Sequence, residues 1–271
     1  MVKWDDLKHS RRMENRKFES PQVGSGGPQA DAERSGEARE TPRARVLDAV
    51  FAARIETPGR FREEFGQRPL VAKLENARHE VDGLTIYEHT RQLLQGLRTD
   101  QLQDARFGDA DIHPPDLLRV VGLYHDAEKS LMVPPQGAEA DWRKPSLKEA
   151  KAASLEMAFA ESAAYQPELL ADPRTRVLFD ELMMNGFYFG YHLDLLKREE
   201  RRFDDEGEAL LEKVLYQPIS RLRAQGLEVE PETLFAAQFA LSRADSSAIG
   251  PYKKNLEALE RLRTRLLDLI N

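Results

Sequence analysis

The sequence contains no cysteine, and this absence removes several chemistries together. Without thiols the chain can form no disulfide and offers no thiolate nucleophile or thiolate metal ligand. Any metal ion that the protein binds must therefore be held by nitrogen and oxygen atoms.

The sequence also lacks a long hydrophobic run and an excess of positive charge. No stretch approaches the ~18 consecutive apolar residues of a membrane-spanning helix, and the N-terminus lacks the apolar core of a signal peptide. We therefore expect no membrane partner and a cytoplasmic location. The formal net charge of −7 argues against a generally basic nucleic-acid-binding protein, but it leaves room for a local basic patch.

Helical periodicity is the main structural signal in the rest of the chain. Charged residues make up 32% and hydrophobic residues 41% of the 271 residues, which is typical of a largely helical protein with a substantial core. We find no sustained strand alternation, internal repeat, glycine-rich phosphate loop or nucleophile elbow. The predicted fold is all-α. The helices are expected near residues 46–55, 70–77, 86–97, 113–126, 147–164, 175–185, 206–223, 231–249 and 252–270.

Residues 1–43 are predicted to be a disordered tail in front of one helical domain at residues 44–271. The stretch from Pro21 to Thr41 has no periodicity and few large apolar side chains, so it cannot offset the entropy lost on folding. The first seventeen residues carry six basic side chains and three acidic ones. This composition is compatible with a segment that docks a partner and with a solvated tail. The sequence does not indicate an oligomeric state.

Three of the expected helices each direct an ionisable group towards the interior. They carry His89, then the adjacent pair His125-Asp126, and then Asp245. Two neutral imidazoles and two carboxylates suit a divalent metal such as Mn²⁺, Mg²⁺, Co²⁺, Ni²⁺ or Fe²⁺, and such sites are built from facing helices in bundle cores. A single inward-facing histidine is more often structural, but three such positions in this order favour a metal site.

The order of these residues resembles the H…HD…D pattern of the HD phosphohydrolase superfamily. The matching words are I-Y-E-H-T, L-Y-H-D-A-E-K and S-R-A-D-S-S, and the likeness runs from about residue 79 to 250. It is closest to the HD domains appended to bacterial tRNA nucleotidyltransferases. The resemblance implies an HD-type helical bundle in which His89, His125, Asp126 and Asp245 bind the metal. It also implies that Lys129 meets a substrate phosphate. Because Asp126 can reach both the ion and a bound water, we expect it to orient or deprotonate the attacking water.

Many members of this superfamily carry two further histidines that hold a second metal ion. The first of these regions here reads S-L-K-E-A-K-A-A-S and has no histidine, whereas the second keeps His192. We therefore expect a single ion, with His192 lining the pocket as a catalytic or substrate-binding residue. His79 and Arg243 are further candidates for substrate binding, because each lies close to a motif residue in the sequence. Each of these side chains also has an ordinary structural interpretation.

Three functions follow from these features. The first is metal-dependent hydrolysis of a phosphoester by a metal-bound water. The substrate would be a phosphorylated small molecule such as a nucleotide, or an RNA end with a 2′,3′-cyclic phosphate or a 2′-phosphate. The second is a non-catalytic module that senses a nucleotide in the same pocket. The third, a purely structural helical protein, leaves four inward-facing ionisable groups unexplained.

Overall fold

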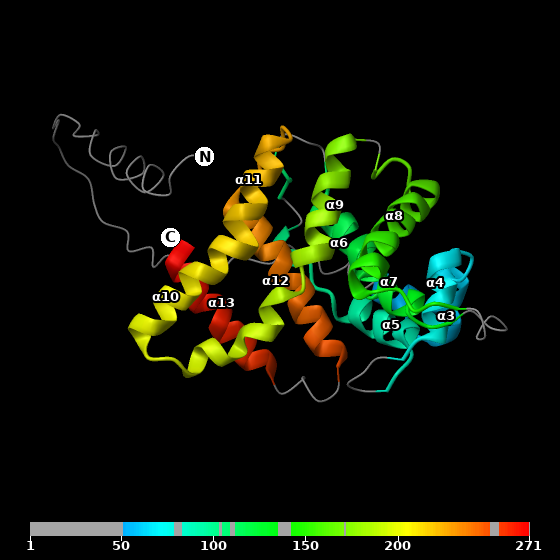
Figure 1. Cartoon of the computed structure of the whole chain (residues 1–271), viewed down its shortest axis with the longest axis horizontal. Helices are drawn as coiled ribbons and strands as arrows, with labels where there is room; N and C mark the ends of the chain where they lie inside the picture. Colours follow the sequence, from blue (N-terminus) through cyan, green and yellow to red (C-terminus); the bar gives the residue numbers. More distant parts are fainter. Residues whose placement is uncertain are drawn as a thin grey trace, which may run out of the picture. The chain divides into compact units, whose positions relative to one another are not determined.

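Short helices that begin at prolines or capping residues build the protein. The computed structural model describes residues 51–78, 83–102, 105–108, 112–134, 142–170, 172–249 and 255–270. Over these ranges the chain is helical and has no β-strand, apart from an isolated antiparallel bridge between Arg78 and Thr85. The all-α prediction is confirmed (Figure 1). All described residues belong to one compact unit, residues 38–271, whereas the predicted tail and its boundary at residue 43 lie outside the described ranges.

The first half of the described chain consists of short helices and the long helix α8. Residues 51–54 are helical, and Pro58 starts the next helix at its first position instead of only ending the preceding one. The elements are α3 (Pro58–Phe65), α4 (Pro69–Lys73), η1 (Leu74–Asn76), α5 (Ile86–Gly96), η2 (Asp100–Leu102), α6 (Pro114–Tyr124), α7 (Ala127–Leu131) and α8 (Leu147–Tyr165).

The second half contains α9, a stretch of 3₁₀ helix and the helices around α12. The predicted helix at residues 206–223 is three consecutive segments, and its irregularity is a π-helical turn at residues 212–216. Gln238 donates to the Val214 carbonyl in this turn at 2.7 Å, which satisfies a backbone group inside the irregular turn. The elements are α9 (Pro173–Asn185), η3 (Tyr188–Lys197), α10 (Glu200–Leu211), η4 (Glu212–Tyr216), α11 (Gln217–Ala224), α12 (Pro231–Ala248) and α13 (Leu256–Ile270).

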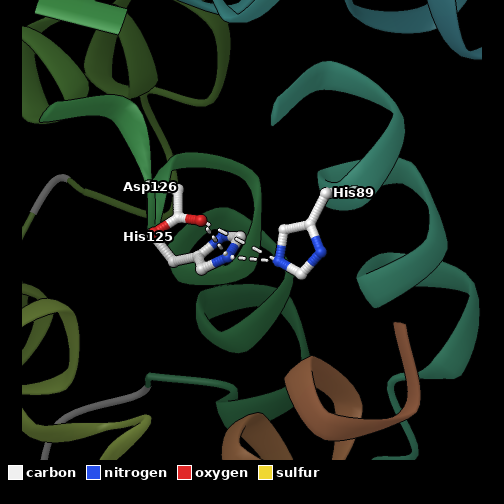
Figure 2. A group of neighbouring side chains, drawn as sticks. All are labelled: His89, His125 and Asp126. Carbon is white, nitrogen blue, oxygen red and sulfur yellow. Dashed lines mark hydrogen bonds and ion pairs between the residues drawn. The ribbon is translucent and has the colours of Figure 1, made fainter. Parts of the chain in front are cut away.

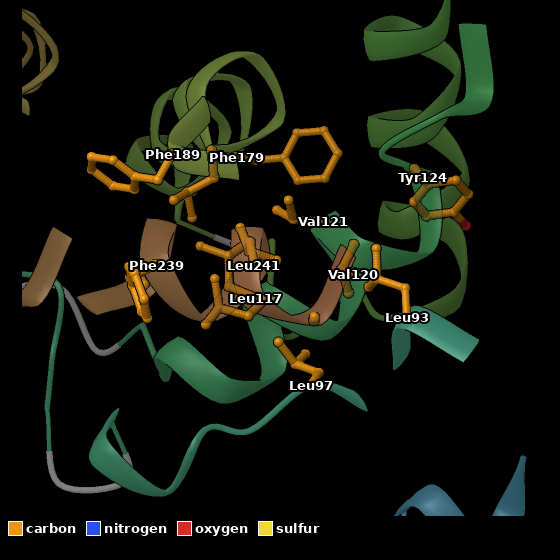
Figure 3. Close-up of a cluster of buried hydrophobic side chains, with 14 of the residues drawn as sticks. Leu93, Leu97, Leu117, Val120, Val121, Tyr124, Phe179, Phe189, Phe239 and Leu241 are labelled. Atoms are coloured by element: carbon orange, nitrogen blue, oxygen red, sulfur yellow. The ribbon is translucent and has the colours of Figure 1, made fainter. Parts of the chain in front are cut away.

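Helix α12 lies at the centre of this arrangement, in contact with α5, α6, η3 and α13 (Figure 1). The core around it is made of side chains with almost no exposed surface from α5, α6, α9, η3 and α12 (Figure 3). Large apolar side chains in such a core each contribute roughly 1.5–3 kcal/mol when fully buried. Because α5 and α6 pack against each other and α12 packs on both, residues far apart in sequence can meet where these helices converge.

Candidate metal centre

His89 is fixed by the way α5 begins. The Thr85 hydroxyl caps the helix by accepting from the Glu88 backbone N–H at 3.1 Å, and the His89 backbone N–H makes a 3.0 Å helical bond to the Thr85 carbonyl. His89 therefore stands at the end of the first turn of α5. Its side chain is fully buried, as the sequence predicts.

His125 and Asp126 lie at a break in the chain rather than within one helix. Helix α6 ends at Tyr124, and Asp126 has φ −110° and ψ 17°, which is not helical. The sequence predicts a helix that includes both residues, at 113–126, whereas α7 starts only at Ala127 and carries Lys129 on a separate short helix. The break turns the Asp126 carboxylate back towards the imidazole of His125, with 3.4 Å between Oδ2 and Nε2.

The imidazoles of His89 and His125 meet at their Nε2 atoms, 3.2 Å apart. Nδ1 of His125 donates to the Gly122 carbonyl at 2.9 Å, which leaves the Nε2 lone pair free for a metal ion. Burial lowers the pKa of His125, with the attraction of Asp126 opposing that change, so the ring is neutral at pH 7. A neutral imidazole is the form that binds a metal ion.

Asp126 completes a group of three residues that can hold a metal ion (Figure 2). One ligand atom from each of His89, His125 and Asp126 lies within 4.8 Å of the other two. Burial raises the pKa of Asp126, but the opposing attraction of His125 and Lys129 is larger and holds this pKa at about 2. The carboxylate is therefore ionised at neutral pH.

Asp245 reaches the same group from α12, as its position on the helix predicts. Its Oδ1 lies 3.0 Å from Nε2 of His89 and 3.8 Å from Nε2 of His125. Metal–ligand bonds of about 2.0–2.2 Å place neighbouring ligand atoms roughly 3.0–3.6 Å apart in octahedral or tetrahedral geometry. The separations of 3.0, 3.2 and 3.4 Å match that range, whereas those from Asp245 to His125 and from Asp126 to His89 are longer, at 3.8 and 3.9 Å. Asp245 is not one of the three residues whose ligand atoms all lie within 4.8 Å of one another. Nitrogen and oxygen are the ligand atoms expected of a cysteine-free chain.

Lys129 contacts the metal-binding group through Asp126. Its Nζ lies 2.8 Å from Asp126 Oδ2. Burial lowers the pKa of Lys129, and the Asp126 carboxylate raises it by more, so the net shift is upward and the ammonium stays charged. Next to it, burial raises the pKa of Glu128 to about 7, with a further contribution from the charge of Asp126. No sequence pattern marked Glu128, whose side chain is buried.

Two aromatic residues that no sequence pattern indicated accompany the candidate metal ligands. The Phe187 ring packs on the His125 ring, with 4.9 Å between centroids. Desolvation raises the pKa of Tyr191, and the carboxylates of Asp245 and Asp126 raise it further. Tyr191 is nevertheless 77% exposed, so it remains accessible to a ligand.

The other predicted substrate-binding residues have different surroundings. His192 stacks on Tyr188 at 4.9 Å, and burial lowers its pKa while Asp194 opposes the change. Arg243 pairs with Glu260 of α13 at 3.0 Å, in a small pocket that the metal ligands do not line. His79 lies outside the described residues. Substrate binding by these three residues stays a prediction.

No family model, curated protein or solved structure matches this chain. In the part of the chain that the structure describes, no helix is long and apolar enough to cross a bilayer. What identifies the region as a candidate metal centre is therefore its own geometry: two imidazole nitrogens and carboxylate oxygens meeting from three parts of the chain.

Proposed function

We propose that the protein is a metal-dependent phosphohydrolase of the HD type that acts on a nucleotide or an RNA-end phosphoester. The observation that carries the proposal is the convergence of His89, His125 and Asp126, with Asp245 3.0 Å from His89. These are the residues of the H…HD…D pattern, and the fold brings them together across 156 positions of sequence.

The ligand set supports one divalent ion per chain. Over the described ranges, His89, His125 and Asp126 form the one group of three or more His, Asp or Glu residues that could hold a metal ion. The region where a further histidine would be expected is instead the start of α8. There Ser146 and Glu149 form a reciprocal capping box, with the Ser146 N–H donating to the Glu149 carboxylate at 2.8 Å. Glu149 therefore serves to start a helix.

The residues around the ligands have separate tasks in this proposal. A bound divalent ion would act as a Lewis acid towards a phosphoryl oxygen and would lower the pKa of a water. Asp126 is ionised and can accept a hydrogen bond or a proton from the attacking water. Lys129 orients the Asp126 carboxylate and adds positive charge where a phosphate would lie. Tyr191 is exposed and would contact the substrate in this proposal.

Metal analysis and a phosphatase screen test the proposal. The purified protein would be assayed with Mn²⁺, Mg²⁺, Co²⁺, Ni²⁺ or Fe²⁺ on nucleotides and on RNA ends with a 2′,3′-cyclic phosphate or a 2′-phosphate. We expect hydrolysis that requires metal, and Asp126→Asn should weaken metal binding by at least about 10–100-fold, as for changes around other metal sites. The far-UV spectrum of the variant should stay helical.

Asp268→Asn is the matched control, since it makes the same substitution at an exposed position on α13. This variant should keep both metal binding and activity. If the wild-type protein binds a nucleotide tightly but hydrolyses none of these substrates, the protein is a nucleotide sensor and not an enzyme. If Asp126→Asn hydrolyses the substrate as fast as the wild-type protein, the candidate metal site takes no part in the reaction.

A further inference from the structure

A second candidate site lies in the groove between η3 and α13. The groove has a volume of about 720 Å³, within the range of roughly 300–1,000 Å³ that is usual for small-molecule sites. The metal ligands are not among the residues that line it. The residues that define its chemistry are Leu193, Asp194, Leu196, Lys197, Arg261 and Arg265.

Positive charge dominates this groove. Lys197 projects from η3, and Arg261 and Arg265 project from α13, whereas Asp194 is the one acidic residue of the lining. The Asp194 carboxylate already lies 3.5 Å from the guanidinium of Arg198, which offsets its charge. Across the described ranges, no carboxylate lies within ion-pair distance of Lys197, Arg261 or Arg265. Three neighbouring cations without a counter-charge attract an anion.

The spacing of the cations favours adjacent phosphate groups. Arg261 and Arg265 are one helical turn apart, and residues at this spacing have Cβ atoms about 5–6 Å apart on one side of a helix. The Arg265 guanidinium lies 3.5 Å from the centroid of the Phe203 ring, so this side chain is held in place before a ligand arrives. Guanidinium groups bind phosphate through paired hydrogen bonds.

The remaining wall of the groove is apolar. Leu193 and Leu196 are half-buried and line it from η3. An apolar surface beside paired cations suits a ligand that carries a base or sugar as well as phosphates. We infer that this groove binds the adjacent phosphates of a nucleotide ligand, either a nucleoside triphosphate or a short single-stranded RNA.

The inference is independent of the proposed hydrolysis. The candidate metal ligands do not line the groove, although the two regions adjoin at η3, which Phe187 directly precedes, and where α13 packs on α12. Binding in the groove can be measured with the metal removed. Failure of phosphate binding and failure of hydrolysis would therefore be observed separately.

Binding experiments in EDTA test the groove. One probe is a fluorescein-labelled hexa-adenylate RNA, followed by anisotropy, and the other is ATP, followed by calorimetry. The variant Lys197→Gln/Arg261→Gln removes two exposed charges and keeps the stacked Arg265. We expect the Kd of the bound probe to rise about tenfold or more. For RNA, the slope of log K against log salt should become shallower by about 1.4, because each lost contact to a single strand contributes about 0.7.

The control variant Lys73→Gln/Lys148→Gln removes the same charge from exposed positions on α4 and α8. It should bind both probes as the wild-type protein does. Binding of RNA alone would identify a strand as the ligand, binding of ATP alone a nucleoside triphosphate, and binding of both their shared phosphate chemistry. The inference is overturned if neither probe binds below about 1 mM, or if the groove variant binds them no more weakly than the control.

Discussion

At the scale of single residues, the contact between Lys129 and Asp126 sets the charge of the candidate site. Asp126 and Asp245 bring two carboxylates near two imidazoles, and the ammonium of Lys129 lies 2.8 Å from one of these carboxylates. One cation cannot balance two carboxylates, so the group retains negative charge that a divalent ion would neutralise. Lys129 then remains available to a phosphate.

The substitution Lys129→Gln separates metal binding from turnover. We expect the variant to retain its metal, because Lys129 is not a ligand, and kcat to fall by about 10²-fold, since a charge that stabilises the transition state is lost. Metal content and steady-state kinetics on the best substrate would measure both quantities. Lys148→Gln removes one charge from an exposed position on the neighbouring helix α8 and should change kcat little. Loss of metal together with activity would show that Lys129 serves the ligand set instead.

Side-chain directions on regular helices could be predicted from sequence, whereas those in irregular segments could not. His89 and Asp245 follow from helical periodicity alone, and both lie where expected. Tyr191 lies in a glycine-interrupted stretch that folds as 3₁₀ helix, and Phe187 directly precedes it, so the periodicity of 3.6 residues does not apply to either. His192 has φ −113° and ψ 20° at a kink of this stretch, so its direction could not be derived from neighbours in sequence.

At the scale of elements, the close approach of α5 and α6 brings the two histidines together. Gly122 lies where a Cβ atom would stand 3.0 Å from Leu93 Cδ2 and 3.1 Å from Leu94 Cδ2. Both leucines are buried in the core and have little room to move. The glycine therefore permits the helix spacing at which the imidazoles of His89 and His125 meet, and its carbonyl also orients His125.

We expect Gly122→Ala to destabilise the protein by about 1–3 kcal/mol, as for overpacking in other cores, and to weaken metal binding. Urea unfolding in EDTA would measure the first effect, and metal titration the second. Gly59→Ala is the control, because its added Cβ would meet only the Thr57 hydroxyl at 3.9 Å. Unchanged stability and metal affinity in Gly122→Ala would mean that α5 and α6 can separate without disturbing the site.

The existence of most helices was predictable, whereas two of their interruptions were not. Prolines at 58, 114, 173 and 231 stand at helix starts, where the missing N–H costs nothing. The break at Asp126 and the π-helical turn at residues 212–216 carry no such marker. The break at Asp126 turns its carboxylate towards the imidazoles of His125 and His89, which a continuous helix would not do.

At the scale of the whole molecule, the metal group depends on contacts between distant parts of the chain. Its ligands stand on α5, on the α6–α7 junction and on α12, and α12 packs against both α5 and α6. The unfolded chain holds these residues far apart, so it offers no comparable site. A metal ion that binds the ligand set must therefore favour the folded state.

Metal binding should accordingly raise the melting temperature of the whole protein. At a free metal concentration 100 times Kd, the stabilisation is about 2.7 kcal/mol, and each kcal/mol raises Tm by about 2–4 °C in a domain of this size. We expect the increase to vanish on adding EDTA and to be absent in Asp126→Asn and in Asp245→Asn, while Asp268→Asn retains it. Calorimetric melts would measure the increase in Tm, and a metal titration, expected to saturate at one ion per chain, would measure the number of ions bound.

If Asp245→Asn kept the full increase in Tm and Asp126→Asn lost it, the ion would be held by His89, His125 and Asp126 alone. Binding of a second metal ion per chain would contradict the single-ion site and would make His192 a candidate ligand of the second ion.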